Sequence, residues 1–163
     1  MSESFIRAKV RRAVPADIPN ICRLLDQYAD QKLLLRRTPE DVAFYLGNFV
    51  VAELDGRFCG CAAARDFGGD LLELRSLAVD AAFQRRGVGR CLVEYLIADL
   101  RQRRSRWKLF TLTYQTDFFQ KLGFVLTSRE CFPEKIWADC SKCPKHDCCD
   151  EVAMQVASEN CVG

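Results

Sequence analysis

The chain has 163 residues, of which 49% are hydrophobic and 28% charged, with 24 Lys and Arg against 22 Asp and Glu. A net charge of +2 and a pI near 8.0 argue against a protein that wraps nucleic acid, which needs a strongly basic surface. Apolar runs are short and residues 1–12 lack the apolar stretch of a secretory signal, so we expect no membrane span and a cytoplasmic protein. A chain of this length can form a core without disulfides or metal, so its ten cysteines need another explanation.

The predicted elements alternate between strands and helices. Thr38 and Pro39 begin a helix, because a hydroxyl N-cap before proline suits the first helical turn. Asp55-Gly56 predicts a hairpin, because a type I′ turn needs positive φ at both central residues. We expect strands at residues 8–14, 49–54, 58–64, 71–79, 107–112, 124–127 and 152–156, and helices from about residues 15, 38, 88 and 116. This order predicts one domain over residues 1–163 with a mixed α/β (α+β) sheet covered by helices.

A glycine-containing turn separates the strand that ends at Val79 from the helix that begins near Val88. Its glycines would let the backbone approach a ligand closely, and the first N–H groups of the helix together with the arginines would attract a pyrophosphate. The sequence lacks the ending of a P-loop, and the alternative is an ordinary turn with solvated arginines. The residues of this 84–90 turn are Gln84, Arg85, Arg86, Gly87, Val88, Gly89 and Arg90.

The surroundings of the 84–90 turn resemble the GNAT superfamily of acetyltransferases. The strand ends in Leu77, Ala78 and Val79, the turn reads Q-x-x-G-x-G, and residues 116–124 read TDFFQKLGF. The resemblance covers essentially the whole chain and implies a GNAT fold, with a mostly antiparallel central sheet flanked by helices. It also implies that acetyl-CoA binds with its pyrophosphate at the 84–90 turn. The backbone N–H groups of residues 77–79 would then bind the pantetheine and polarise the thioester.

A narrower resemblance is to the short bacterial N-acetylglutamate synthases of arginine biosynthesis. Residues 34–38, 73–79, 110–115, 118–124 and 133–144 carry it, and the last segment is the most discriminating. This resemblance implies acetyl transfer to the α-amine of L-glutamate, the first step of arginine biosynthesis. Two alternatives stay open: an acetyltransferase for another small amine or a protein N-terminus, and a sensor that binds acetyl-CoA without catalysis.

The chemistry of this transfer needs a base for the ammonium proton and cations for the substrate carboxylates. Glu73 is the expected base, at a position where many members of the superfamily carry a glutamate. Its alternative is a half-buried carboxylate paired with Arg75. Arg37, Arg75 and Lys135 are the expected substrate clamps, each with the alternative of a surface cation.

The resemblance departs from the family at one position. Many relatives protonate the leaving thiolate with a tyrosine, where this chain carries Phe119, which we expect at the cofactor. Tyr114, five residues earlier, is the substitute acid, or the thiolate leaves unprotonated, because a thiol pKa near 8.5 makes it a tolerable leaving group.

The cysteines fall into separate groups. Cys59, Cys61 and Cys91 follow the apolar pattern and are expected in the core. A cysteine-rich segment, residues 131–150, holds four with the spacing of a zinc site, and reduced thiols in a loop are the alternative. These are Cys140, Cys143, Cys148 and Cys149.

A basic run at residues 101–108 could bind nucleic acid or an acidic partner but better fits a helix end followed by an exposed turn. The partners we expect are the amino-acid substrate and a second copy of the chain as a homodimer, with neither nucleic acid nor membrane.

Overall fold

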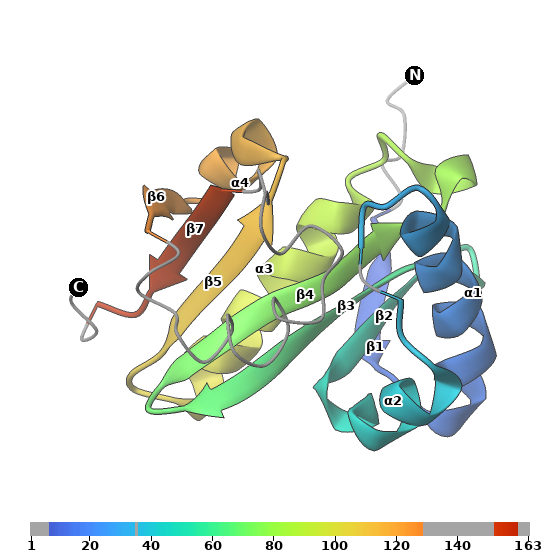
Figure 1. Cartoon of the computed structure of the whole chain (residues 1–163), viewed down its shortest axis with the longest axis horizontal. Coiled ribbons are helices and arrows are strands. Elements are labelled where there is room, and N and C mark those ends of the chain that lie inside the picture. Colours follow the sequence, from blue (N-terminus) through green and yellow to red (C-terminus); the bar gives the residue numbers. More distant parts are fainter. Residues whose placement is uncertain (1–6, 35, 129–151, 160–163) are drawn as a thin grey trace. The chain divides into compact units, whose positions relative to one another are not determined.

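A computed structural model describes residues 7–34, 36–128 and 152–159. Seven strands of these residues form a sheet in the order β1-β2-β3-β4-β5-β7-β6 (Figure 1). Among the pairs with a defined register only β4 and β5 run parallel, and the others are antiparallel. The strands are β1 (Lys9–Arg12), β2 (Phe49–Leu54), β3 (Arg57–Gly68), β4 (Leu71–Val79), β5 (Lys108–Thr113), β6 (Val125–Thr127) and β7 (Val152–Ala157). The prediction of a mixed sheet is confirmed.

Helices occupy the predicted places. The α-helices are α1 (Ile18–Asp30), α2 (Pro39–Phe44), α3 (Val88–Arg103) and α4 (Thr116–Lys121), and three 3-10 turns are η1 (Pro15–Asp17), η2 (Leu46–Asn48) and η3 (Ala81–Phe83). The described chain divides into two compact units. Unit 1 comprises residues 1–64 and 76–100, unit 2 comprises residues 65–75 and 101–163, and β3 and β4 contribute to both.

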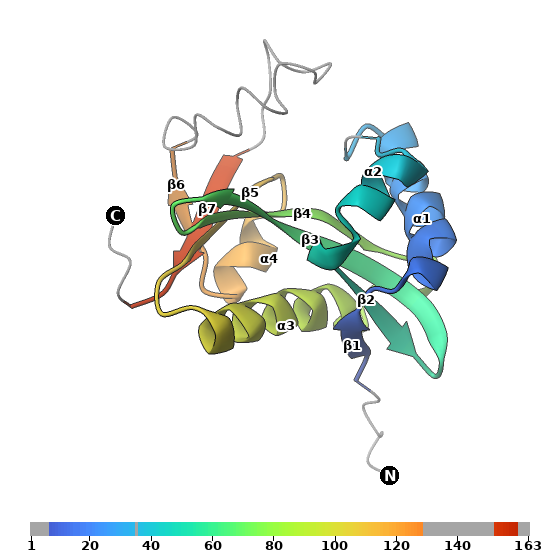
Figure 2. The ribbon, with the colours of Figure 1, turned by 90° about the horizontal axis from the view of Figure 1, so that it is seen from below.

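Unit 1 is a layered structure in which α1 and α2 lie on one face of its strands and α3 on the other (Figure 2). Helical spacing gives α1 an apolar face, which buries Ile21, Leu24 and Leu25 against strand residues such as Val51 and Cys61. On the α3 face, a Cβ added to Gly60 of β3 would meet side chains of α3 at 3.2 Å. Strand alternation therefore buries both faces of this part of the sheet.

The local signals of unit 1 are confirmed by backbone geometry. Thr38 caps α2, since its side chain accepts a hydrogen bond from the Asp41 backbone N–H at 3.1 Å. Asp55 and Gly56 have φ values of 54° and 75°, as a type I′ hairpin turn requires.

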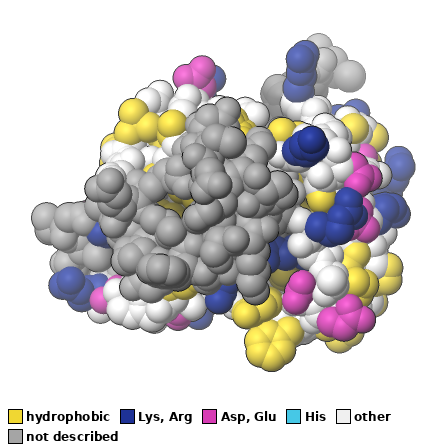
Figure 3. All heavy atoms as spheres, in the orientation of Figure 1, with side chains coloured by type: hydrophobic (Ala, Val, Ile, Leu, Met, Phe, Trp, Pro, Cys, Tyr) yellow, Lys and Arg dark blue, Asp and Glu magenta, His cyan; other side chains and the backbone are white. Residues whose placement is uncertain are grey.

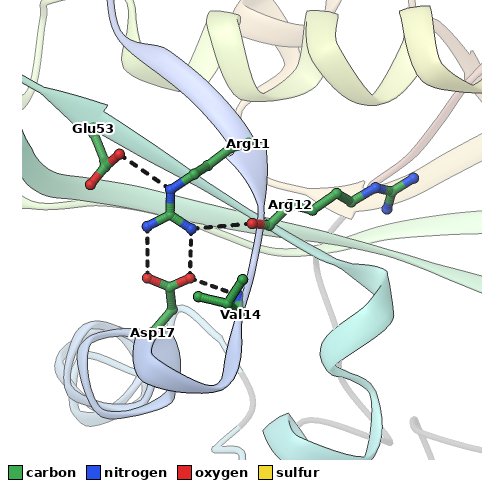
Figure 4. A network of polar contacts seen from close by, with 5 residues as sticks. All are labelled: Arg11, Arg12, Val14, Asp17 and Glu53. Carbon is green, nitrogen blue, oxygen red and sulfur yellow. Dashed lines mark hydrogen bonds and ion pairs between the residues drawn. The ribbon is translucent and has the colours of Figure 1, made fainter.

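A polar network fastens the start of unit 1 (Figure 4). Arg11 of β1 donates two hydrogen bonds to the carboxylate of Asp17, at 2.8 and 3.0 Å, and one to Glu53 of β2 at 3.2 Å. The backbone N–H of Val14 donates to the same Asp17 carboxylate at 2.8 Å. Asp17 is only 7% exposed, so this network supplies the partners that a buried carboxylate needs. It joins two strands to the turn that starts α1.

Unit 2 is built around β5, β7 and β6. β7 pairs antiparallel with β5 on one side and with β6 on the other, and α4 packs against β7. Phe110 of β5 is fully buried and its ring centroid lies 6.2 Å from that of Phe67 on β3. Trp107, also buried, exchanges two hydrogen bonds with Ser158, at 2.9 and 3.1 Å. The basic run contributes to this unit, where Arg104 pairs with Asp66 at 2.5 Å.

Two further expectations concern burial. In the described part of the chain, no helix combines the length and the apolar character needed to cross a bilayer. Cys59 and Cys61 are fully buried, as predicted for core residues, whereas Cys91 on α3 is only partly buried.

Candidate active site

The 84–90 turn lies in unit 1 between η3 and α3. Gly87 has φ 75°, a left-handed conformation that suits glycine, and Arg85 adopts φ 65° despite its side chain. The side chains of Arg85, Arg86 and Arg90 are exposed. Because the first N–H groups of a helix have no intrahelical acceptor, the start of α3 adds a positive partial charge to these cations. This geometry fits an anionic group such as a pyrophosphate.

Aromatic and acidic contacts orient two arginines of the turn. The guanidinium carbon of Arg86 lies 5.9 Å from the ring centroid of the buried Phe83, and that of Arg57 lies 5.3 Å from the same ring. Arg90 pairs with Glu94 one helical turn later, at 3.2 Å. Within the described residues Arg85 and Arg86 form no ion pair with a carboxylate, so the turn retains net positive charge.

Tyr28 of α1 links the end of β4 to the 84–90 turn. Its hydroxyl donates to the Val79 carbonyl at 2.8 Å and accepts from the Val79 N–H at 3.2 Å and from the Gln84 side-chain amide at 3.4 Å. Tyr28 also packs against the core cluster of unit 1, and its polar tip is the one sequence signal of this further role. The backbone N–H of Val79 was expected to bind pantetheine. In the structure both the N–H and the carbonyl of Val79 form hydrogen bonds with the Tyr28 hydroxyl.

β4 is irregular between its two halves. Ser76 is 6% exposed and has φ 56°, which is uncommon for a residue with a side chain, and its carbonyl accepts a hydrogen bond from the Cys61 thiol at 3.5 Å. The register of β4 with β5 covers only the three residues from Leu71 to Glu73, which precede Ser76. Strained backbone of this kind is often found at functional sites, so Ser76 indicates that β4 contributes to one. No sequence signal pointed to it.

Glu73 and Arg75 form a pair on the unit 2 part of β4. Arg75 donates its Nε to Glu73 Oε1 at 2.7 Å, and its Nη2 bonds the same oxygen. The side chain of Glu73 is 3% exposed and that of Arg75 is 11% exposed. The structure therefore brings together the predicted base and one predicted clamp, in the paired arrangement given as the alternative for Glu73. Both of these hydrogen bonds go to Oε1.

Tyr114 and Phe119 lie in unit 2 beyond β5. Glu73 is in register with Phe110 of β5, and Tyr114 follows Phe110 by four residues, about 13 Å at the usual strand rise. Tyr114 is 39% exposed. Phe119 is 3% exposed, and its ring lies 5.0 Å from that of Phe124, so it serves the core of this unit. Whether either residue meets the cofactor stays a prediction.

The remaining predicted clamps are placed as follows. Arg37 precedes α2 in unit 1 and is partly buried, while its neighbour Arg36 pairs with Asp26 and Asp30 of α1. Basic and acidic side chains accordingly lie side by side over α1 (Figure 3). Lys135 lies outside the described residues.

The predicted zinc ligands also lie outside the described residues; they are Cys140, Cys143, Cys148 and Cys149. In the part of the chain that the structure describes, no three His, Cys, Asp or Glu side chains gather as a metal site. The described cysteines are free thiols. Burial raises the pKa of the Cys59 thiol to about 11 and also raises the pKa values of Cys22 and Cys61. These three thiols are therefore poor nucleophiles, which disfavours an acetyl-cysteine intermediate on them.

Comparison with known proteins identifies the class. The family described as an acetyltransferase (GNAT) domain matches residues 25–126. The chain therefore belongs to the GNAT family and is an acetyl-CoA-dependent N-acetyltransferase, as the sequence motifs predicted. It is 39% identical over 145 residues to an uncharacterized N-acetyltransferase of Chlorobaculum tepidum, a match that covers 89% of this chain and 93% of that protein.

Other relatives are named more specifically. An amino-acid acetyltransferase of Mycobacterium tuberculosis is 37% identical over 122 residues, which cover 73% of this chain and 69% of that protein. An N-acetylglutamate synthase from Neisseria gonorrhoeae, solved with coenzyme A and N-acetyl-glutamate, superposes with a TM-score of 0.80 at 28% identity. That superposition covers 93% of this chain but only 35% of the synthase. The GNAT fold, with a mostly antiparallel sheet flanked by helices, is confirmed.

Proposed function

We propose that this protein transfers the acetyl group of acetyl-CoA to the α-amine of L-glutamate, the N-acetylglutamate synthase reaction that opens arginine biosynthesis. The observation that carries the proposal is the Glu73–Arg75 pair, a carboxylate 3% exposed beside a guanidinium on the strand that leads to the 84–90 turn. The similarity to amino-acid acetyltransferases and to an N-acetylglutamate synthase supports the choice of an acidic amino acid.

In this proposal Glu73 acts as the base. An ammonium group cannot attack a thioester, so its proton must first be removed, and a positioned carboxylate can accept it. Arg75 fixes the rotamer of Glu73 through two hydrogen bonds to Oε1. In this proposal Arg75 is a positioning residue instead of the substrate clamp predicted from the sequence, because it contacts Glu73. Arg37 is the candidate for the α-carboxylate.

The neutral amine then attacks the thioester carbonyl, the C–N bond forms and the C–S bond breaks. Acetyl-CoA supplies the activated acetyl group, and the exposed arginines with the first N–H groups of α3 would hold its pyrophosphate. The departing thiolate takes a proton from Tyr114 or leaves as the anion. Direct transfer in a ternary complex fits the raised pKa values of the buried thiols.

The test is release of free CoA from acetyl-CoA with L-glutamate, compared with other amino acids, a polyamine, an N-terminal peptide and no acceptor. We expect glutamate to give the highest kcat/KM. Glu73→Gln should lower kcat about 100- to 1,000-fold while the KM for acetyl-CoA stays the same, because only proton transfer is lost. Glu40→Gln, an exposed glutamate on α2, is the matched control.

Each alternative has its own outcome. A higher kcat/KM for another amine would reject glutamate as the substrate. Binding of acetyl-CoA with no release for any acceptor would favour a sensor. Full activity of Glu73→Gln would reject the assigned base.

A further inference from the structure

We propose that Arg57, at the start of β3, binds the 3′-phosphate of coenzyme A and makes the protein prefer coenzyme A to its 3′-dephospho form. This inference rests on the part of the proposed function that places the pyrophosphate at the 84–90 turn, and it extends that assignment to another phosphate of the same cofactor. Arg57 lies outside the turn and is not part of the motif that predicts it.

Backbone contacts bring the start of β3 beside the 84–90 turn. The backbone N–H of Asp80, one residue past β4, donates a hydrogen bond to the carbonyl of Cys59 on β3 at 2.8 Å. The Asp80 side chain then caps η3, because it accepts a hydrogen bond from the Ala82 N–H at 3.0 Å. η3 ends at Phe83, immediately before the 84–90 turn, and all of these residues belong to unit 1.

The ring of Phe83 is a common platform for two arginines. Phe83 is 7% exposed, and the guanidinium carbons of Arg57 and Arg86 lie 5.3 and 5.9 Å from its ring centroid. Because both distances end at one point, the two guanidinium carbons are at most about 11 Å apart. Cation–π attraction to a buried ring restricts both side chains before a ligand binds, which lowers the entropic cost of holding an anion.

Both arginines can receive an anion. Arg57 and Arg86 are exposed, and neither pairs with a carboxylate in the part of the chain that the structure describes. The carboxylates that precede Arg57 in the chain do not neutralise it. Glu53 bonds Arg11 at 3.2 Å, and the exposed Asp55 of the hairpin turn, itself a described residue, forms no ion pair with Arg57.

The charges of the cofactor match this arrangement. The pyrophosphate carries two negative charges, which Arg85 and Arg86 of the turn can balance together with the first N–H groups of α3. Arg90, the third arginine of the turn, already pairs with Glu94. The 3′-phosphate is a monoester and carries a further charge of about −1.5 to −2 near pH 7. Arg57 is suited to this additional phosphate, because it comes from another element and yet shares a ring with the turn.

The distances also agree. Six covalent bonds join the 3′-phosphorus to the nearer phosphorus of the pyrophosphate, which keeps these two atoms about 5–7 Å apart. A guanidinium that contacts a phosphate has its carbon about 4 Å from the phosphorus. Two guanidinium carbons no more than about 11 Å apart can therefore each contact one of the two phosphates. Dephospho-coenzyme A keeps the pyrophosphate and has a hydroxyl at the 3′ position, so it lacks only the group assigned to Arg57.

Calorimetric titration with coenzyme A and with dephospho-coenzyme A tests the assignment. We expect the wild type to bind coenzyme A about tenfold more tightly than the dephospho form. Arg57→Gln should weaken the binding of coenzyme A about five- to tenfold and leave that of dephospho-coenzyme A within twofold. Arg57→Lys should keep part of the preference, because it retains the charge but not the forked donors. Arg23→Gln, which removes an exposed arginine of α1 in the same unit, is the matched control and should keep the full preference.

Equal affinity of the wild type for the two ligands would overturn the inference, and so would an equal loss of affinity for both in Arg57→Gln. Arg86→Gln separates the inference from the assignment on which it rests, because both ligands carry the pyrophosphate and should lose affinity alike. If Arg86→Gln spared both ligands while Arg57→Gln abolished the preference, the pyrophosphate assignment would fail and that of Arg57 would stand. None of these titrations contains an acceptor, so a substrate other than glutamate would leave their results unchanged.

Discussion

Replacement of Asp17 by asparagine tests the network that anchors β1, η1 and β2. The change removes the negative charge that two Arg11 donors contact at 2.8 and 3.0 Å, while an amide oxygen remains for one donor. Hydrogen bonds to a charged group contribute about 1.5–3 kcal/mol each, and loss of one partner of a buried pair costs about 3–5 kcal/mol. Because the Arg11 side chain is 41% exposed and can be solvated, we expect a loss of about 2–3 kcal/mol at pH 7.

This loss should depend on pH in a defined direction. The hydrogen bonds from Arg11 lower the pKa of Asp17 in the folded state below its ordinary value. The unfolded chain therefore binds more protons between the two pKa values, and the stabilisation is complete above the unfolded pKa of about 4. It should disappear as the pH falls through the folded pKa, because the protonated acid no longer pairs with Arg11.

Urea denaturation from pH 7 to pH 2.5 measures both effects, and a thermal scan at pH 7 should show a decrease in Tm of about 5–10 °C. Asp26→Asn is the matched control, since the Asp26 side chain is 48% exposed and its pair with Arg36, at 3.0 Å, should contribute less than about 1 kcal/mol. A difference between Asp17→Asn and wild type below about 0.5 kcal/mol at pH 7, or one that persists undiminished at pH 2.5, would refute this reasoning.

Two further predictions concern unit 1. Gly60→Ala should destabilise the protein by about 1–3 kcal/mol in urea denaturation, because the new Cβ would lie 2.9 Å from the Ala78 carbonyl oxygen. Tyr28→Phe should cost about 1–2 kcal/mol and weaken acetyl-CoA binding about three- to tenfold in calorimetry, because the hydroxyl no longer ties Val79 to the 84–90 turn.

Matched controls accompany these two variants. Gly47→Ala should be nearly neutral, since an added Cβ at Gly47 meets nothing within 4 Å. Tyr95→Phe changes a tyrosine of α3 and should leave acetyl-CoA binding unaltered. Equal stability of Gly60→Ala and wild type would contradict the close approach of β3 to β4, and tighter cofactor binding by Tyr28→Phe would mean that the hydroxyl competes with the ligand instead of positioning its site.

Local patterns predicted the elements well. Thr38 caps α2 and Asp55-Gly56 forms the hairpin turn, because caps and tight turns depend on a few neighbouring residues. Glu73 and Arg75 could be placed on one face from their spacing, and their pairing was one of two predicted outcomes. Ser76 could not be predicted, because a left-handed serine inside a strand contradicts its own local preference and persists only where surrounding contacts impose it.

The sequence alone determined the family, the order of strands and helices and the 84–90 turn, because these depend on periodicity and on short motifs in a fixed order. Tertiary structure decided which partner each polar group found. Tyr28 meets Val79 across 51 residues, Arg75 serves Glu73, and Arg57 shares Phe83 with Arg86. Such contacts follow from strand register and helix packing, and no local pattern specifies how two distant segments align.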